Sequence, residues 1–426
     1  MFPEATEARG GRSLSVLCAG ILLCGTSAIP EIAQAKDSLT VDLSAGLEGS
    51  TNSDLGASGS SAAIGAQLGA AINYRIIEAR TTLNLGASGN ASTYFNGSSA
   101  DLSTGLTADL QHRLSQAVSV GVFGHYTYAQ SNGSGYLLNS SGVVGVPPGS
   151  ILSPTPEPPI ITPPVTGMGT VLPPDVTLLG RRLTQRSFGG GASLQWRLSK
   201  RSTLLVSGSA NRQTFNDPLL SNYRALGQSV SLTRAISETT SVSAQFQIAE
   251  VRYDNGERDT IMTPMVGVSR RLSRIYNLSV SGGASIVRAR LPDGTRLHSA
   301  TLAMSANLCG KYERSTLCFN LQRQETPTSL GGVRPLSSAS VTYIDRLNTN
   351  DTLSFSAQVS RSGRDTRRIF PEQTSAAGTA RYDHRLSDRL SLFGSAQYIR
   401  LWQSGVSSRS DFRGVIGIAV RLGDRG

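Results

Sequence analysis

Arginine recurs at one position of a repeated pattern in this chain, and its chemistry is the recognition of anions. The triplet Arg-Leu-Ser, or a close variant, separates runs of alternating apolar and polar residues. A guanidinium group makes forked contacts to carboxylate, sulfate or phosphate groups, whereas an ammonium group does not. If these arginines share one face, they form a basic collar that attracts anions. The collar candidates are Arg75, Arg113, Arg197, Arg271, Arg346, Arg385 and, in the last segment, Arg421.

A structural interpretation of the same arginines is that each binds a nearby turn carboxylate, such as Asp388, or the carbonyl groups of its own turn. Without residues 1–35, which hold two arginines and three glutamates, 38 basic residues stand against 26 acidic ones. Lysine is rare and occurs at Lys36, Lys200 and Lys311. We expect an anionic solute, an acidic polymer or a lipid head group as partner. No nucleic-acid-binding module is recognisable, so we expect no nucleic acid.

Cys309 and Cys318 are the only cysteines that follow residue 35. A tight turn at Glu313 and Arg314 sets them opposite each other as a non-hydrogen-bonded pair, the closer kind in an antiparallel ladder. Both side chains then fall on the polar face of the sheet. We predict a cross-strand disulfide, in keeping with an oxidising compartment. Two reduced, buried thiols are the alternative.

The remaining reactive side chains predict no enzyme, metal or cofactor. The four histidines lack metal-ligand spacing to one another or to cysteine. Asp383 and His384 are adjacent in sequence, so in a strand they point to opposite faces and form no dyad. Neither a nucleophile elbow nor a phosphate-binding loop is recognisable. The histidines are His112, His125, His298 and His384.

The first 35 residues are typical of a cleaved secretory signal peptide. Arg9 and Arg12 give a positive start, residues 14–29 are apolar, and Ala33-Gln34-Ala35 is a small-x-small cleavage pattern. The apolar stretch is too short for a stable membrane span. We expect the exported chain to begin at Lys36.

From Leu39 onwards, apolar and polar residues alternate, which predicts β-strands. Forty-five glycines and abundant serine also favour one large sheet over several globular domains. Eighteen strands are expected, an even number, with sixteen as the alternative. They lie at about 39–47, 62–76, 83–87, 102–114, 118–128, 188–198, 203–213, 224–236, 241–253, 260–272, 277–290, 297–312, 316–324, 336–347, 352–361, 376–386, 389–401 and 410–422.

The Arg-Leu-Ser triplets end one strand and precede the next, as short turns on one rim of a barrel do. A closed antiparallel barrel leaves no backbone group unpaired in lipid, so we predict a transmembrane β-barrel in the outer membrane with short periplasmic turns. Two aromatic belts support this prediction. Tyr74, Trp196, Tyr312, Tyr343 and Tyr382 lie near the short-turn rim, and Tyr126, Tyr128, Tyr223, Tyr253, Tyr398 and Trp402 near the opposite rim.

Residues 131–181 interrupt the alternation and hold ten of the 18 prolines. Such a stretch cannot pair in a ladder and favours extended, hydrated conformations. We expect a long extracellular loop. It is either a disordered surface loop or a loop that folds into or over the pore, or that touches a partner.

The segment Tyr382-Asp-His-Arg-Leu-Ser-Asp-Arg-Leu-Ser-Leu-Phe-Gly-Ser-Ala-Gln-Tyr398 joins such a turn to a Leu-x-Phe strand start. In this pattern the chain, over roughly residues 38–422, resembles the β-barrel porins of the outer membrane, several of which are encoded with exopolysaccharide synthesis or export systems. The resemblance implies a barrel embedded in outer-membrane lipid and assembled by the barrel-insertion machinery, with no catalytic residue. One departure is the last strand, which ends at Leu422 and not on an aromatic residue.

The sequence therefore predicts a water-filled, arginine-rich passive channel for small anionic or sugar-type solutes. One alternative is an accessory or exit barrel for a secreted polysaccharide, which has the same fold and needs periplasmic partners. Another is a secreted β-rich adhesin, against which the two aromatic belts argue.

Overall fold

The computed structural model describes residues 36–53, 62–95, 100–131, 183–364, 372–403 and 406–423. These residues form the eighteen antiparallel strands that the sequence predicts, in the expected order. The signal segment at 1–35 and the Pro-rich stretch from residue 132 lie outside the described residues, so both remain predictions. In the described part, no helix is long and apolar enough to cross a membrane.

The strands alternate in direction around one sheet. Their bounds are β1 (Lys36–Ser50), β2 (Ala63–Ile77), β3 (Thr81–Tyr94), β4 (Asp101–Arg113), β5 (Val118–Ser131), β6 (Leu183–Arg197), β7 (Ser202–Phe215), β8 (Tyr223–Ala235), β9 (Thr240–Tyr253), β10 (Arg258–Arg271), β11 (Tyr276–Arg290), β12 (Arg296–Lys311), β13 (Ser315–Pro327), β14 (Val333–Arg346), β15 (Asp351–Ser362), β16 (Gln373–Arg385), β17 (Leu390–Gln403) and β18 (Val406–Gly423).

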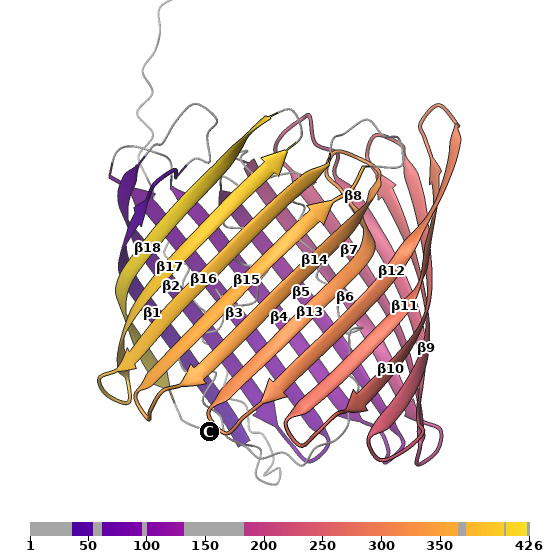
Figure 1. The fold of residues 1–426 in the computed structure, drawn as a ribbon, viewed down its shortest axis with the longest axis horizontal. Coiled ribbons are helices and arrows are strands. Elements are labelled where there is room, and N and C mark those ends of the chain that lie inside the picture. Colours follow the sequence, from indigo (N-terminus) through magenta and orange to yellow (C-terminus); the bar gives the residue numbers. More distant parts are fainter. Residues whose placement is uncertain are drawn as a thin grey trace, which may run out of the picture. The chain divides into compact units, whose positions relative to one another are not determined.

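Each strand pairs with its neighbours in sequence, and β18 returns to pair with β1, which closes the sheet into a barrel (Figure 1). The seam runs without interruption from Thr40 opposite Gly423 to Ser50 opposite Arg413. A closed sheet has no edge strand, which suits lipid because lipid offers no hydrogen-bonding partner to an unpaired backbone group. A barrel of this many strands is wide enough to enclose a lumen and is not filled by side chains alone.

The two faces of the wall differ as a membrane barrel requires. In β11, Val280 and Ile286 are exposed on the outer face, whereas Ser285 and Val287 are buried on the inner face. Around the barrel, exposed leucine, isoleucine, valine and phenylalanine side chains form an apolar outer band. Apolar surface of this extent is stable in lipid and not in water. The protein is an outer-membrane β-barrel.

The repeated serine of the Arg-Leu-Ser triplet explains the repeated turn. After β4, the Ser115 hydroxyl accepts hydrogen bonds from the backbone N–H groups of Ala117 and Val118, both at 3.1 Å. After β14, the side-chain oxygen of Asn348 takes the same role. A side chain that satisfies two turn amides fixes a tight reversal. The same contacts are made by Ser237, Ser273 and Ser387.

Two residues of the expected outer aromatic belts lie on the other face. Trp196, Tyr382 and Trp402 are exposed outwards, as predicted. Tyr223 and Tyr253 are only 2% and 4% exposed, and they pack together in a cluster on the inner face. Their assignment to a lipid-facing belt was wrong, because each stands one residue out of phase with the outward side chains of its strand.

A buried network of charges locks the seam at its long-loop end. On β18, Arg413 donates to Asp411 at 2.6 Å and to Glu48 of β1 at 3.4 Å. Tyr94 of β3 donates to the same Glu48 carboxylate at 2.8 Å, and Ser50 donates to Asp411 at 2.8 Å. All five residues are buried. The network ties the last strand to the first and third.

Replacing Arg413 tests the contribution of this network. Without its charge, two carboxylates stay buried with no guanidinium between them, which is strongly destabilising. We predict that Arg413→Gln lowers the free energy of unfolding by about 3 kcal/mol, measured by urea titration with heat-modifiable gel migration as the readout. Arg234→Gln, at an exposed outer position of β8, is the matched control and leaves the midpoint unchanged. Equal midpoints for the two variants would contradict the account.

Candidate functional site in the barrel lumen

All seven collar candidates lie at the short-turn end of the barrel, on its inner face. They stand at or near the ends of β2, β4, β6, β10, β14, β16 and β18. The strand alternation sets their direction. Arg197 follows the outward Trp196, and Arg271 follows the outward and exposed Arg270. The structure therefore gathers at one rim the arginines that are far apart in sequence.

The collar arginines differ in how they are engaged. Arg421 donates to Asp42 of β1 at 2.7 Å, and Arg385 donates to the Thr349 carbonyl of the neighbouring turn at 2.6 Å. Arg346 is also engaged. Arg421 and Arg385 are thus held by fixed groups of the wall, but these are a strand carboxylate and the carbonyl of a neighbouring turn and not the groups of their own turns. The four collar arginines that form neither an ion pair nor a side-chain hydrogen bond with any described residue are Arg75, Arg113, Arg197 and Arg271.

Lys311 belongs to the same rim, although the sequence analysis did not include it. It is exposed at the end of β12, two residues after the inward-facing Cys309. The matching position on β8 is Ala235. Its position directly before the turn at Tyr312 could have identified Lys311 as a member of the rim. The Leu-Ser pair that follows several of the collar arginines is missing after it. Every even-numbered strand except β8 therefore brings an inward-facing cation to this rim.

The inner wall between the two rims is mostly polar and uncharged. On β15, Ser354 and Ser356 lie on the inner face and are buried. Hydroxyl groups also bond across strands, as between Ser207 and Ser229 at 2.7 Å. Such groups can exchange hydrogen bonds with water, sugars and small anions. Among the described residues, no cluster of histidine, cysteine and carboxylate side chains could hold a metal ion.

One inner-face charge pair is neutralised within the wall. Arg381 holds Asp383 through two nitrogens, at distances between 2.7 and 3.1 Å, and its guanidinium lies 4.3 Å from the centre of the Phe393 ring. The neighbouring His384 points the other way and contacts Asp351 at 2.6 Å on the outer face. The two adjacent residues therefore form no dyad, as their alternation predicts.

The hairpin between β13 and β14 leaves the wall at the long-loop end. Pairing of β12 with β13 stops at Met304 and Arg323, and pairing of β14 with β15 begins at Leu336. Beyond these points β13 and β14 pair only with each other, from Gln324 opposite Leu336 to Pro327 opposite Val333, and we name residues 324–335 the inward hairpin. The Ser329 carbonyl accepts from the Ser221 amide at 2.7 Å. This contact lies far around the barrel from β13 and β14.

Apolar packing holds the tip of the inward hairpin against the inner face of β8–β11. Val333 is buried in a cluster with Tyr253, Val251 and Val287, and the Tyr253 hydroxyl donates to the Gly332 carbonyl at 2.7 Å. Four strands separate β13 from β8 in the sheet. The hairpin reaches them by crossing the interior, so it narrows the lumen at the long-loop end.

Buried charges and two glycines complete this contact. Arg334, Glu257 and Asp259 are at most 1% exposed, and each takes part in a polar or electrostatic interaction. Gly331 and Gly332 have φ angles of 83° and 78°, a conformation that side chains disfavour. The Gly-Gly pair in the sequence predicts a turn, but it does not predict that the hairpin bends towards the lumen.

Cys309 and Cys318 lie directly opposite each other on β12 and β13. Their Cα atoms are 4.1 Å apart, and the sulfur atoms are joined. Both lie on the inner face, because the outward Phe319 directly follows Cys318. The disulfide joins β12 to β13 near the short-turn rim, two residues from Lys311 and five residues from Met304 and Arg323, where the pairing of the two strands stops.

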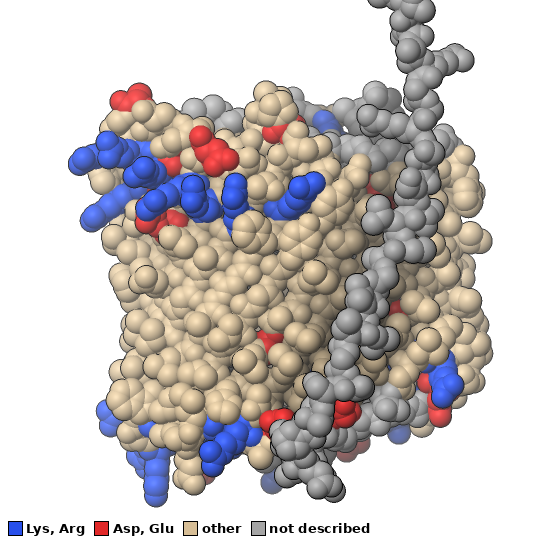
Figure 2. Space-filling model, turned by 180° about the vertical axis from the view of Figure 1, so that it is seen from behind, with Lys and Arg blue, Asp and Glu red and all other residues tan. Residues whose placement is uncertain are grey.

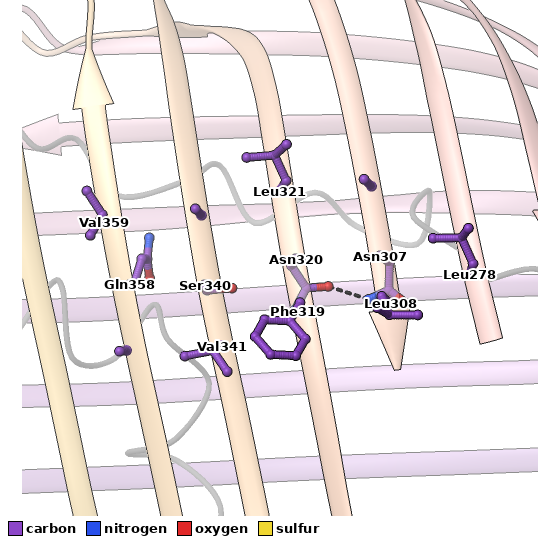
Figure 3. A pocket seen from close by; sticks show the side chains of 13 residues that line it. Leu278, Asn307, Leu308, Phe319, Asn320, Leu321, Ser340, Val341, Gln358 and Val359 are labelled. Atoms are coloured by element: carbon purple, nitrogen blue, oxygen red, sulfur yellow. Dashed lines mark hydrogen bonds between the residues drawn. The ribbon is translucent and has the colours of Figure 1, made fainter. Parts of the chain in front are cut away.

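A hollow of about 440 Å³ in the wall faces lipid and not the lumen (Figure 3). The small side chains of Ala306, Ala339 and Ala357 leave the space open. Phe319 and Val359, both about half exposed, line its sides. These are outward positions of β12–β15. An apolar, lipid-facing hollow offers no binding group to a water-soluble solute, so we do not assign it to the passage.

No family model matches the chain, and no curated protein matches it. Solved structures that resemble it include Pseudomonas aeruginosa OccK2 (OpdF) in complex with glucuronate, at 12% identity and a TM-score of 0.44, with 91% of this chain and 98% of that chain covered. Pseudomonas aeruginosa OpdK with vanillate is 11% identical, with coverages of 91% and 99% and a TM-score of 0.43. A BenF-like porin from Pseudomonas fluorescens Pf-5 is 10% identical, with coverages of 92% and 99% and a TM-score of 0.43. These likenesses assign no ligand to this chain.

Releasing the inward hairpin is predicted to widen the passage. Val333→Asp puts a carboxylate into the apolar cluster of Tyr253, Val251 and Val287, and desolvating it costs several kcal/mol, which is more than one apolar side chain contributes there. We expect a larger single-channel conductance in planar bilayers. Leu219→Asp, at a position 75% exposed in the turn after β7, is the control and leaves conductance unchanged. A folded Val333→Asp barrel with unaltered conductance would show that the hairpin does not limit the passage.

The disulfide can be read from tryptic peptides. Trypsin cuts after Lys311 and Arg314, so the peptides that hold Cys309 and Cys318 remain linked only through sulfur. We predict one linked species in the purified barrel, which separates into two on reduction. Free, alkylated Cys309 and Cys318 peptides without reduction would refute the bond.

Proposed function

We propose that the protein is a passive outer-membrane channel for small anionic or sugar-type solutes. The observation that supports this most directly is the ring of inner-face cations at the short-turn rim, which includes four arginines that form neither an ion pair nor a side-chain hydrogen bond with a described residue. Fixed charge of one sign, lining a mouth with low-dielectric walls, concentrates counter-ions and repels ions of like charge. The collar therefore favours anions over cations.

The path through the barrel has three parts. At the long-loop end, a solute passes beside the inward hairpin. It then meets a wall of hydroxyl and amide groups, which exchange hydrogen bonds with a hydrated solute at little net cost. At the short-turn end it reaches the collar. Movement along this path is diffusion, and selection depends on the width beside the hairpin and the charge at the collar.

The position of the inward hairpin favours small solutes over a polysaccharide. An exit barrel must let a polymer thread its full length. Here the hairpin lies across the long-loop end and is held by buried contacts of Val333, Tyr253 and Ser329. A polymer would have to displace this packing, whereas a small solute passes beside it.

Uptake into liposomes tests the channel and the collar together. A neutral hexose and its uronate form have similar size and differ in charge, so the ratio of their swelling rates isolates the effect of charge. We predict that the unmodified barrel admits the uronate faster, and that Arg197→Gln with Arg271→Gln lowers the ratio roughly threefold.

The matched control is Arg234→Gln with Arg270→Gln. It removes two arginines at the same end of the barrel, but from the outer face. We expect its ratio to equal that of the unmodified protein. An equal fall in both double variants would refute a selective collar, and no uptake of either solute would refute a passive channel.

A further inference from the structure

Six arginines form a continuous ladder across six neighbouring strands at the long-loop end. The strand register sets each one directly opposite the next, without a gap. Since neighbouring strands are about 4.8 Å apart, the ladder follows about 24 Å of wall. Its members, from β7 to β12, are Arg212, Arg224, Arg252, Arg258, Arg290 and Arg296.

The ladder lies on the outer face of the barrel. Arg252 is exposed, whereas its chain neighbours Val251 and Tyr253 are buried under the inward hairpin. On β11, Arg290 is likewise exposed while Ala289 is buried. Figure 2 shows lysine and arginine side chains gathered in a belt near one end of the outer surface, above a body of other residues.

The ladder has little counter-charge within the described part of the chain, where Glu250 lies beside two of its members, Arg252 and Arg258. Of its six members, Arg252 alone forms an ion pair there, with Glu250 at 2.8 Å. Like charges directly opposite each other across strands destabilise a sheet. A row of five such pairings is therefore expected to have an anionic partner from outside the chain.

We propose that the ladder binds the phosphate groups of the phosphorylated glycolipid in the outer leaflet. The long-loop end of an outer-membrane barrel faces the exterior, and the ladder borders the apolar band, at the level of lipid head groups. Arginine suits phosphate because its fork makes two parallel hydrogen bonds. The ladder is also a line along the wall and not an enclosed pocket, which fits the edge of a lipid layer. The inference depends on the outer-membrane location and not on which solute the lumen admits.

Lipid binding to the refolded, full-length barrel tests this proposal. The probe is bisphosphorylated lipid A in detergent, with dephosphorylated lipid A as the comparison. Arg258→Gln with Arg290→Gln removes two directly opposed members of the ladder. At about fivefold per arginine near an anionic surface, we expect affinity for the phosphorylated lipid to fall by about 30-fold. Affinity for the dephosphorylated lipid is expected to stay unchanged.

Arg234→Gln with Arg270→Gln is the control, because it removes two outward arginines at the opposite end. An equal loss in this control, or no loss in the ladder variant, would overturn the proposal. Competition by inorganic pyrophosphate at the concentration of the lipid would indicate a site for soluble anions and would also overturn it. Solute uptake by the ladder variant is expected to match the unmodified barrel, so failure here is separable from failure of the channel proposal.

Discussion

The hydrogen bonding of the backbone in lipid is the constraint on which the rest of the structure depends. Every strand must pair on both sides, so β18 must return to β1, and the seam is reinforced by the buried Arg413, Asp411 and Glu48. Once the sheet is closed, successive side chains of each strand point alternately to the outer face and to the lumen. Arg270 and Arg271 are neighbours in sequence, yet one faces outward and the other belongs to the collar.

The wall of β8–β11 at the long-loop end uses both of its faces. Inside, Tyr223, Tyr253 and Val251 hold the tip of the inward hairpin. Outside, on the same strands, stand members of the arginine ladder. The apolar packing on the inner face gives a rigid backbone behind these charged side chains. The same short stretch of these strands therefore holds the inward hairpin on its inner face and the arginine ladder on its outer face.

The strand count, the strand order and the inward direction of the collar could be predicted from the sequence, because a period of two residues fixes the face of every side chain. The opposed positions of Cys309 and Cys318 also followed, since a short turn fixes the register of its own hairpin. Other features depend on long-range packing. Period alone could not show that residues 324–335 leave the wall. The inward direction of Tyr223 and Tyr253 does follow from the period, and they were misplaced because the belt was assigned from their nearness to the rim. The ladder was also missed, because it exists only when the registers of six strands are combined.

The role of the collar can be measured as the reversal potential of the unmodified barrel, in a planar bilayer with potassium chloride at different concentrations on the two sides. We expect steady conducting steps and a reversal potential of the sign that chloride selectivity gives. A cation-selective potential would contradict the role of the collar. A folded, inserted barrel that carries no current would contradict an open passage through the lumen.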